Sequence, residues 1–511
     1  MPDTVPPPGA PQAADSAPAE PAPYDPPGAP VAPAPQAADS APTASAPHPP
    51  LRLDALGPGG PYRTRERLTL RDVAGRPAGE LSLVPTLYVT RAMAALHKAA
   101  TPPTERRLAA LARAGRLFAS GTVDGMTADA YLTTVCRLSG TPLANVRIAV
   151  EAIRLSATGA YRSVQAARPV GAVNDWRDPA ARSGTAVWVR RGDVFAVHAA
   201  GNHPAVHALW LESLALGYRV AVRPSRREPL TPYRLVSALR TAGFGPDQVM
   251  LLPTDHDAAG EILRAADLGM VYGGQEVIDR YGGDPLVLPN GPGRSKILIT
   301  ADSDWRDHLD TVVDSVARHG GTACVNATAV FVEGADPAPL ARALAERLAE
   351  LPVLPPEDER AVLPVHPVDV ARGMESHLHA VAGTATAWLG GAGQGPGGGG
   401  VVAELGDGSA VLRPAVHQLD SPHAAQARVE LPFPCVWVAP WTREAGVEVL
   451  GDSLVLTAIT EDEELLDALL AEPSIRNLYI GDHPTHWIAP GIPHDAYLGE
   501  FLMRSKAVIR G

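Results

Sequence analysis

Between residues 193 and 299 the sequence alternates short apolar runs with amphipathic stretches, and this alternation restricts the possible folds most. The amphipathic stretches place apolar residues three and four positions apart, which predicts helices, among them one from about Pro204 to Leu216 and one from about Thr231 to Ala242. Strands separated by single helices indicate a parallel sheet covered on both faces. The chain is therefore expected to hold a doubly wound α/β domain, which binds ligands at the carboxyl ends of its strands. The predicted strands are DVFAVHAAG, RVAVRPS, QVMLLP, DLGMVYGG and SKILIT.

A second α/β series follows the first. It begins with a predicted helix around Trp305–Arg318 and continues through the strand TAVFVEG, the helix PLARALAERLAEL and the strands PCVWVAP and SLVLTAIT. The region from about Thr86 to Ser163 is predicted to be helical. We therefore expect the helical region and the first α/β domain over 56–300, the second α/β domain over 301–480, and a C-terminal segment over 481–511.

Residues 1–55 differ in composition from the rest of the chain. The segment APQAADSAP occurs at residues 10–18 and again at 34–42, and residues 1–50 hold 17 of the 52 prolines but no Lys or Arg. Such a tract buries too little apolar surface to offset the entropy of ordering, so residues 1–55 are predicted to be a disordered tail. Both a dispensable extension and a docking arm for a partner fit this composition.

Charge and cysteine usage exclude several classes of protein. The formal net charge of −12 argues against a protein that binds nucleic acid or anionic lipid. Cys136, Cys324 and Cys435 are too few for a disulfide framework or a four-cysteine metal site, which favours a reducing cytoplasm. No apolar run reaches the roughly 18 residues that span a bilayer, and the N-terminus lacks the pattern of a secretory signal. No metal site is expected, because two groups of histidines lack acidic or cysteine ligands in a recognised pattern: His198, His203 and His207, and His483, His486 and His494.

Cys324 is the strongest candidate for a reactive residue. It lies in HGGTACVNATAVFVEG, after a predicted helix and before an apolar strand, where small residues let a backbone approach a ligand closely. A thiol in such a turn is a nucleophile if it ionises readily, and otherwise a small buried apolar residue. His319, five residues earlier, is a candidate for promoting that ionisation, whereas Cys136 and Cys435 are expected in the core.

Three further motifs accompany GGTACVNATAVFV: an upstream run AAGNHPAVHALWLESLALGYRVAVRPS, then VYGGQEV, and finally ELPFPCVWV. In this order and at these spacings they resemble the aldehyde dehydrogenase superfamily, over roughly residues 90–505. The resemblance implies an aldehyde-dehydrogenase-like α/β fold with a doubly wound cofactor domain within 56–300 and a catalytic domain over 301–480. It also implies that the segment 481–511 serves oligomerisation.

The resemblance implies that Cys324 is the nucleophile and that Asn202 donates its side-chain amide to the oxyanion, together with the Cys324 backbone N–H. Such donors are needed because thiolate attack on a carbonyl builds negative charge on oxygen, and one preorganised donor is worth about 3 kcal/mol. Without the resemblance, Asn202 is read as the N-cap of the helix predicted from about Pro204.

Arg223, Pro224 and Ser225 stand where the family has a Lys-Pro-Ser run, whose Lys contacts the adenosine ribose. Arg226 follows, where NAD-preferring members often have an acid that binds the ribose diol. Together with Arg223 or Arg227, it can instead pair with a 2′-phosphate by fork geometry. The implied cofactor is NADP(H), with NAD(H) as the alternative, and a solvated basic turn is the reading without a cofactor.

Two more cofactor contacts are implied by the same resemblance. Gly273 and Gly274 match the Gly-Ser turn that opens a helix toward the pyrophosphate, although Gly274 lacks the usual hydroxyl. Glu430 matches the acid that holds the nicotinamide ribose. The other reading of Glu430 is a carboxylate at the start of a surface strand.

Asn290 is the main departure from the family pattern. Hydrolytic aldehyde dehydrogenases have a Glu 34 residues before the nucleophile, and Asn290 occupies that position in LPNGPGRSK. Because Asn does not accept a proton at neutral pH, hydrolysis of the acyl-enzyme loses its general base. CoA-dependent members tolerate such a replacement because their acyl group passes to a thiol and not to water.

The chain therefore most resembles the acyl-thioester reductases of the superfamily, which include fatty-acyl reductases of luminous bacteria and streptomycete proteins of antibiotic or aryl-acid metabolism. The implied function is NADPH-dependent reduction of an acyl-CoA, a carrier-bound acyl group or an activated acid to an aldehyde, through a thioester on Cys324, in secondary metabolism. An acyl-activating ligase or a carrier protein is the implied partner, and a homodimer or homotetramer is expected. The alternatives are NAD(P)-dependent oxidation of an aldehyde, which needs a base other than Asn290, and a non-catalytic or partner-dependent subunit of a carboxylic acid reductase complex.

Overall fold

The structure is a computed structural model that describes residues 51–334, 336–393, 397–489 and 491–509. These residues belong to a unit that spans Pro50–Gly511. Most of the tail predicted over 1–55 lies outside the described residues. Its last part is regular structure, because Leu51–Leu53 form strand β1 and strand β2 begins at Ala55.

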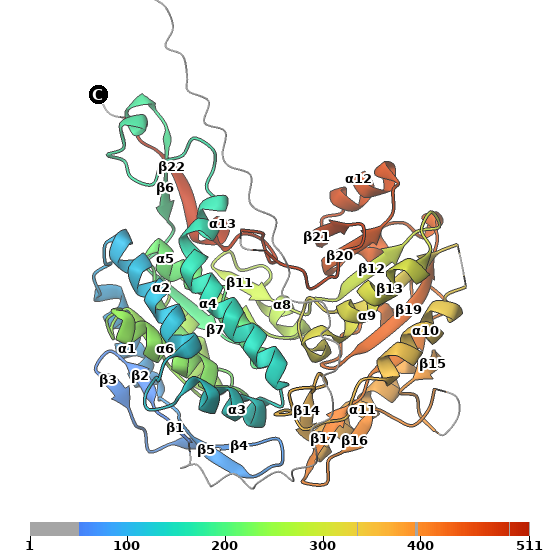
Figure 1. The fold of residues 1–511 in the computed structure, drawn as a ribbon. Helices are drawn as coiled ribbons and strands as arrows, with labels where there is room; N and C mark the ends of the chain where they lie inside the picture. The colour runs from blue at the N-terminus through green and yellow to red at the C-terminus, as the bar shows by residue number, and fades with distance from the viewer. Residues whose placement is uncertain (1–50, 335, 394–396, 490, 510–511) are drawn as a thin grey trace, which may run out of the picture. The chain divides into compact units, whose positions relative to one another are not determined.

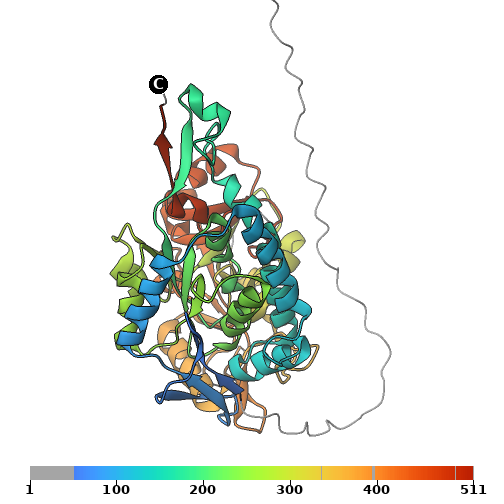
Figure 2. The same cartoon turned by 90° about the vertical axis from the view of Figure 1, so that its left-hand side faces the viewer.

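Four helices form the region that the sequence predicts to be helical, which confirms that prediction. Helices α2 and α4 pack side by side against the first large sheet (Figures 1 and 2). Helix α3 begins where the Thr127 side chain accepts a hydrogen bond from the Ala130 N–H, and it ends at Gly140, whose φ of 72° stops the helix. The helices are α1 (Thr86–Lys98), α2 (Thr104–Ser120), α3 (Ala128–Ser139) and α4 (Leu143–Ala166). A small sheet precedes them, in the order β1-β5-β4, with β4 (Arg67–Arg71) and β5 (Pro77–Ser82).

The first large sheet has seven strands in the order β11-β10-β7-β8-β9-β2-β3 (Figure 1). Five neighbouring strands are parallel, and β2 and β3 add an antiparallel edge. The chain adds β8 and β9 on one side of β7 and then β10 and β11 on the other, so the strand order reverses between β7 and β10. This topology confirms the predicted doubly wound domain, and the reversal marks where such sheets bind ligands. The prediction was wrong for SKILIT, because Ser295–Ile299 pairs within the second large sheet and not within this one. The strands are β2 (Ala55–Gly57), β3 (Gly60–Tyr62), β7 (Val194–His198), β8 (Arg219–Arg223), β9 (Val249–Leu251), β10 (Leu268–Tyr272) and β11 (Val287–Asn290).

One helix of this domain differs from its prediction. The stretch predicted as one helix from about Pro204 to Leu216 is a 3-10 turn, Pro204–His207, followed by the short helix α5, Leu211–Leu216. The indole N–H of the buried Trp210 donates to His207 Nδ1 at 3.1 Å, and this contact holds the chain at the break. The remaining helices match their predictions: α6 (Leu230–Ala242), α7 (His256–Arg264) and α8 (Gln275–Tyr281).

The second large sheet also has seven strands, in the order β15-β18-β19-β13-β12-β20-β21 (Figure 1). Only the β15–β18 pair is antiparallel among its pairs. The helix predicted around Trp305–Arg318 is a 3-10 turn, Trp305–His308, followed by α9 (Leu309–Ala317). The strands are β12 (Ser295–Ile299), β13 (Ala327–Glu333), β15 (Thr386–Leu389), β18 (Ala415–Gln418), β19 (Cys435–Trp441), β20 (Ser453–Ile459) and β21 (Ile475–Ile480).

The other elements of this half cover the second sheet or extend it. A three-stranded sheet in the order β14-β17-β16 lies next to helix α11. The bounds are β14 (Val365–Pro367), β16 (Val402–Glu404), β17 (Ser409–Leu412), α10 (Ala338–Ala349), α11 (Val368–Ala382) and α12 (Glu463–Ala471).

Both large sheets are buried on both faces, as blunt apolar strands predict. Along β7, Phe195 and Val197 pack in one apolar cluster, whereas Val194 and Ala196 pack in another on the opposite face. The second sheet likewise separates two clusters. Cys136 and Cys435 lie in these clusters, which confirms their assignment to the core, and burial raises the pKa of the Cys136 thiol to about 12.

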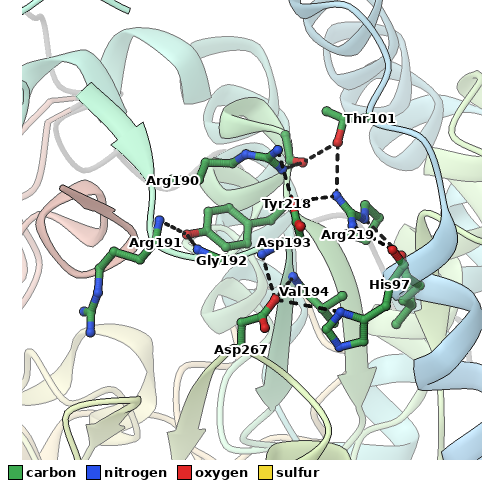
Figure 3. Close-up of polar contacts among 12 residues, drawn as sticks. His97, Thr101, Arg190, Arg191, Gly192, Asp193, Val194, Tyr218, Arg219 and Asp267 are labelled. Carbon is green, nitrogen blue, oxygen red and sulfur yellow. Dashed lines mark hydrogen bonds and ion pairs between the residues drawn. The ribbon is translucent and has the colours of Figure 1, made fainter. Parts of the chain in front are cut away.

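A network of polar contacts lies at the amino ends of β7, β8 and β10 (Figure 3). Asp267 Oδ2 accepts hydrogen bonds from the Asp193 N–H at 2.7 Å and the Val194 N–H at 2.9 Å. The Arg219 guanidinium donates to Asp193 at 3.1 Å and to the His97 carbonyl at 3.3 Å. These bonds satisfy backbone groups that the strand ends leave unpaired.

Tyr218 connects this network to the C-terminal segment. Its hydroxyl accepts hydrogen bonds from the Arg191 N–H at 3.1 Å and the Gly192 N–H at 3.2 Å, and it donates to the Leu502 carbonyl (Figure 3). Leu502 ends helix α13 (Leu498–Leu502), and strand β22 (Met503–Ala507) follows directly. Strand β22 pairs antiparallel with β6 (Ala186–Arg190), and the two strands lie side by side in both views (Figures 1 and 2).

Candidate active site

Cys324 lies in the loop between α9 and β13. The loop turns sharply because His319, Gly320 and Gly321 all have positive φ angles, of 55°, 70° and 65°. A Cβ at Gly321 would come 2.3 Å from the Pro434 nitrogen, so glycine is required for this close approach. The two glycines that the sequence places before the cysteine therefore shape the turn that presents it.

Asn326 fixes the shape of this loop. Its Oδ1 accepts a hydrogen bond from the Ala323 N–H at 3.0 Å, and its Nδ2 donates to the carbonyls of Ser315 at 3.0 Å and Arg318 at 2.7 Å. The side chain is buried, so these bonds replace lost hydration and hold the loop in one conformation. Sequence reasoning did not single out Asn326.

The start of β12 and the turn before it lie directly against Cys324. The Ser295 hydroxyl donates to the Cys324 carbonyl at 3.0 Å. A Cβ on Gly293 would come 1.8 Å from the same carbonyl oxygen, so no larger residue fits there without a shift of the loop. The nucleophile loop therefore rests on the turn that links the first sheet to the second.

The side chain of Cys324 contacts His494, which comes from the C-terminal segment. The distance from Cys324 Sγ to His494 Nε2 is 3.5 Å, and His494 Nδ1 lies 2.7 Å from Asp495 Oδ2. Sequence reasoning missed this pair, because it considered His494 only as a metal ligand. A His-Asp dipeptide carries no spacing signal that relates it to a cysteine far away in the chain.

Charge interactions act on His494, whose side chain is only 27% exposed. Burial alone would lower the pKa of His494, but the Cys324 sulfur and the Asp495 carboxylate together raise it well above its usual value. For Asp495, burial raises the pKa, but the hydrogen bond and charge of His494 and the charge of Arg476 lower it overall. Burial, with the charges of Asp495 and Cys324, raises the pKa of the Tyr272 phenol, which therefore stays neutral near the thiol.

The sequence suggested His319 as the group that promotes ionisation of the Cys324 thiol, but the structure gives its ring other neighbours. Its ring packs against the rings of His203 and His486, at centroid distances of 4.9 Å and 5.8 Å. Burial, together with the neighbouring histidines, lowers the pKa of His319 well below its usual value. The imidazole that contacts the thiol is therefore His494.

Asn202 joins the two halves of the site. It follows β7, and its Nδ2 donates a hydrogen bond to the Thr322 carbonyl, two residues before Cys324, at 2.9 Å. An amide nitrogen carries two hydrogens, so a second N–H remains for an oxyanion. The other reading, a helix cap, is not what the structure shows, because His203 Nδ1 accepts from the Ala205 N–H at that turn.

Asn290 ends β11, beside the end of β10, where Tyr272 is its register partner. Its carbonyl accepts a hydrogen bond from the Gly273 N–H at 3.1 Å. The side chain is buried, and its Nδ2 has no hydrogen-bond partner among the described residues. The position therefore holds a neutral amide where hydrolytic family members are expected to have a carboxylate.

The predicted adenosine contacts lie at the carboxyl end of β8. Arg223 Nε donates to the Thr254 hydroxyl at 3.0 Å, and the Ser225 hydroxyl accepts from the Arg227 N–H at 3.2 Å. A Cβ on Gly201, after β7, would come 2.3 Å from the Ser225 hydroxyl, so only glycine leaves this space between the strand ends open. The structure thus brings Arg223 and Ser225 to the strand ends that bind nucleotides in doubly wound sheets.

Arg226 differs from its neighbour Arg227 in what it contacts. Arg227 donates to the Ser139 carbonyl at 3.0 Å, which occupies it with the chain's own backbone. The Arg226 Nε is buried and has no hydrogen-bond partner among the described residues. A buried, unpartnered guanidinium nitrogen at the adenosine end fits an anionic group such as a ribose phosphate.

Gly273 and Gly274 follow β10 and open helix α8, as predicted. The Gly274 N–H donates to Glu276 Oε1 at 3.1 Å, so this carboxylate takes the place that a phosphate oxygen would need. Because a carboxylate and a pyrophosphate repel each other, Glu276 has to turn away before an anion can bind here. The residues at the carboxyl ends of these strands thus fit the adenosine end of a dinucleotide better than its pyrophosphate.

Glu430 lies inside the structure and contacts the segment before β12. Its Oε2 accepts a hydrogen bond from the Arg294 N–H at 2.7 Å. Burial raises the pKa of Glu430, although the backbone bonds to Gly293 and Arg294 oppose that shift. The carboxylate therefore lies next to the turn that supports Cys324, and its predicted contact with a nicotinamide ribose stays a prediction.

Metal and membrane features were also searched among the described residues. In that part of the chain, no group of three or more His, Cys, Asp or Glu side chains is arranged to hold a metal ion. The helices within the described ranges are also too short or too polar to cross a bilayer.

Comparisons with known proteins give one consistent family. The model of the aldehyde dehydrogenase family matches residues 86–445. Human aldehyde dehydrogenase 1A1 is 29% identical over 143 residues, which cover 26% of this chain and 28% of that enzyme. The match therefore spans less than a third of the length of this relative.

Solved structures resemble almost the whole described chain. The aldehyde dehydrogenase KauB from Pseudomonas aeruginosa has a TM-score of 0.72 at 16% identity, covering 89% of this chain and 96% of that one. An NADP-dependent enzyme of E. coli has a TM-score of 0.73 at 16% identity, covering 89% and 98%. At these identities the likeness shows the fold, and it confirms the expected α/β architecture with a cofactor-type sheet and a second, cysteine-bearing sheet.

Proposed function

The chain belongs to the aldehyde dehydrogenase family, and on this premise we propose that it oxidises an aldehyde with NAD(P) through a thioester on Cys324. The observation that carries the proposal is the hydrogen bond from Asn202 Nδ2 to the Thr322 carbonyl, at 2.9 Å. This bond brings the Asn202 amide, from the ligand-binding end of the first sheet, to the loop that bears Cys324, which supports its use as an oxyanion donor.

Four residues of the chain act in the first half of the reaction. The Cys324 thiolate forms a C–S bond to the aldehyde carbon, and the second N–H of Asn202 donates to the oxyanion that develops. Arg226 and Ser225 would hold the adenosine end of the cofactor. A bound nicotinamide ring supplies the hydride acceptor that turns the adduct into a thioester.

We favour NADP(H) over NAD(H) as the cofactor. Arg226 stands where an acid would select a free ribose diol, and its Nε has no partner within the described part of the chain. Burial and the charge of Arg226 lower the pKa of the Arg223 guanidinium, so the two cationic groups lie close to each other. Two guanidinium groups at this place favour a 2′-phosphate by charge and by fork geometry.

A second candidate is NADPH-dependent reduction of an acyl thioester or activated acid to an aldehyde, with a ligase or a carrier protein as the partner. Asn290 favours this candidate because an amide does not serve as a general base. The contact of His494 with Cys324 supports aldehyde oxidation instead, because it offers a base at another position. The third candidate is a subunit of a carboxylic acid reductase complex that is active only together with the ligase.

One set of assays separates these candidates. The protein is given NADP or NAD with a panel of aldehydes, with and without CoA, and then NADPH with a panel of acyl-CoAs, while nicotinamide absorbance is followed. We expect aldehyde oxidation that does not need CoA and that disappears in Cys324→Ala. Consumption of NADPH that depends on acyl-CoA, without CoA-independent oxidation, would instead establish the reductase. Activity that appears only with an added ligase would establish the subunit.

The assembly and the location are also part of the proposal. Strand β22 pairs with β6 of its own chain, and Val173 bridges to Val187 on the other side of β6, so β22 is the strand of this sheet that leaves an edge for a further strand. A homodimer or homotetramer in the cytoplasm fits this arrangement, with the segment 481–511 at the interface. Light scattering during size-exclusion chromatography measures the assembly directly.

A further inference from the structure

Resting on the proposed aldehyde oxidation, we propose that His494 is a catalytic residue that takes the proton of the Cys324 thiol and later the proton of the water that hydrolyses the thioester. Asp495 is its positioning residue. Two contacts carry the inference, Cys324 Sγ to His494 Nε2 at 3.5 Å and His494 Nδ1 to Asp495 Oδ2 at 2.7 Å. A nucleophile, a base and a group that orients the base thus form one chain of contacts.

The order of these contacts fixes the tautomer of His494. Because the Asp495 carboxylate accepts a hydrogen bond from Nδ1–H, the neutral imidazole has its lone pair on Nε2. That lone pair faces the sulfur at 3.5 Å. His494 is therefore oriented to receive the thiol proton and not to donate one.

The backbone around His494 is held in place. The Asn477 amide on β21 donates to the His494 carbonyl and, at 2.8 Å, to the Leu454 carbonyl. The Tyr497 hydroxyl donates to the Gly491 carbonyl at 3.0 Å, which closes the loop that carries the His-Asp pair. The imidazole therefore meets the thiol from a segment that is tied to the second sheet.

Two neighbouring groups favour the protonated form of His494, Cys324 from the nucleophile loop and Asp495 from its own segment. Burial lowers the pKa of His494, and the interactions with Cys324 and Asp495 override that effect. Arg476 on β21 and Tyr272 on β10 face the same group of side chains, because Arg476 interacts with Asp495, and Tyr272 interacts with both Asp495 and Cys324. The surroundings of His494 therefore help it to hold a proton taken from the thiol.

The balance shifts after the first half of the reaction. A thioester sulfur carries no charge, so the Cys324 contribution that raises the pKa of His494 disappears, while burial still lowers that pKa and Asp495 still raises it. In the proposed sequence, His494 gives its proton to solvent at this stage and becomes a neutral base. Thioester formation itself thus prepares the base for the second half.

The proton and bond changes balance across the two halves. In the first, the thiol proton passes to Nε2, the C–S bond forms, and hydride leaves the aldehyde carbon for NAD(P). In the second, Nε2 takes a proton from water, the new C–O bond forms and the C–S bond breaks, which returns the thiolate and releases the acid. Overall, aldehyde, water and oxidised cofactor give acid, reduced cofactor and one proton.

The first test measures the thiol alone and does not depend on the substrate. The alkylation rate of Cys324 by iodoacetamide is followed between about pH 5 and pH 9 in the wild type, His494→Gln and Asp495→Asn, with His483→Gln as the control. His483 lies in the same segment and packs against Trp487, at 6.0 Å between ring centroids. Cys136 and Cys435 are buried, so labelling reports Cys324.

We expect His494→Gln to lower the alkylation rate at about pH 6 by at least about 10-fold and to make that rate rise steeply with pH. Asp495→Asn is expected to act in the same direction, because an amide can donate to Nδ1 and so turn Nε2 into a donor. The control is expected to match the wild type. Identical pH profiles for the wild type and His494→Gln would overturn the proposal, whatever the substrate.

The second test separates the two halves of the reaction. With an aldehyde substrate found by the assays above, His494→Gln at high pH is expected to release about one equivalent of reduced cofactor per site and then turn over at least about 100-fold more slowly. Its melting temperature is compared with that of the wild type to exclude unfolding. A variant with wild-type turnover would overturn the role of His494 in hydrolysis. If no aldehyde is oxidised while the alkylation profile shifts, the proposed function fails and the proton transfer from the thiol stands.

Discussion

Asn290 and His494 show how a single side chain limits or enables one step of a reaction. Asn290 is buried with an unpartnered Nδ2, and an amide at this place neither accepts a proton nor repels a neighbouring thiolate. A carboxylate there would bring a second negative charge into a site that already holds Asp495. The loss of the acid at 290 and the presence of the pair at 494 and 495 are thus electrostatically compatible.

Substitutions of Arg226 test the proposed preference for NADP over NAD. Replacing it with Gln removes the charge that we expect to meet a 2′-phosphate, and replacing it with Glu adds repulsion. We expect the KM for NADP to rise about 10-fold or more in Arg226→Gln and further in Arg226→Glu, with little change in the KM for NAD. Arg306→Gln, an exposed arginine paired with Asp304, is the control. Equal changes in both KM values would contradict this role.

At the scale of elements, the approach of the 290–295 turn to the nucleophile loop sets the position of the thiol. A Cβ on Gly293 would come 1.8 Å from the Cys324 carbonyl oxygen, and both atoms belong to backbone that cannot move freely. We expect Gly293→Ala to lower kcat at least about 10-fold, because a displacement of about 1 Å at a reacting group has such effects. Gly283→Ala is the matched control, since a Cβ there meets no atom within 4 Å. Unchanged kcat in Gly293→Ala would show that the loop does not need this support.

Regular elements were predictable from the sequence because their apolar period is local. The strand QVMLLP and the helix from about Thr231 to Ala242 appear as β9 and α6 with small shifts at their ends. The break within 204–216 was not predictable, because it depends on the contact between Trp210 and His207 inside the fold. A propensity pattern does not contain such tertiary contacts.

In the candidate site, too, some residues could be predicted from the sequence and others could not. Cys324 and Asn202 were singled out because motifs of fixed spacing carry them. The structure has the Asn202 amide against the loop that bears Cys324, and the roles of the two residues stay predictions. His494 was not predicted to belong to the site, because its partner lies 170 residues away and only the fold brings the two together. The signal was a His beside an Asp, which is common on protein surfaces.

The whole molecule contains many histidines that are neutral because they are buried. Burial lowers the pKa of His198, for example, to about 3 and that of His203 to about 4. Below about pH 6.5 an unfolded chain binds protons that these rings do not bind in the fold, so stability is present above that pH and is lost as the pH falls. The same direction holds for His207, His319, His366, His417 and His486.

Four groups act in the opposite direction, and the histidines outnumber them. Burial raises the pKa of Glu212 to about 7 and also raises those of Glu228 and Glu430, while contacts with Cys324 and Asp495 raise that of His494. We expect the free energy of unfolding in urea to fall by at least about 2 kcal/mol between about pH 7 and pH 5. A flat or rising stability over that interval would contradict the burial of these rings as neutral groups.

The anchoring of the C-terminal segment has a consequence for the order in which the site is made. A ribosome completes every strand of both large sheets before it adds His494, because β21 ends at Ile480. The Tyr218 hydroxyl can bind the Leu502 carbonyl only later still. A nascent chain therefore carries its thiol without the proposed base while residues 325–493 are added, and the proposed site is complete only when the segment that bears His494 docks.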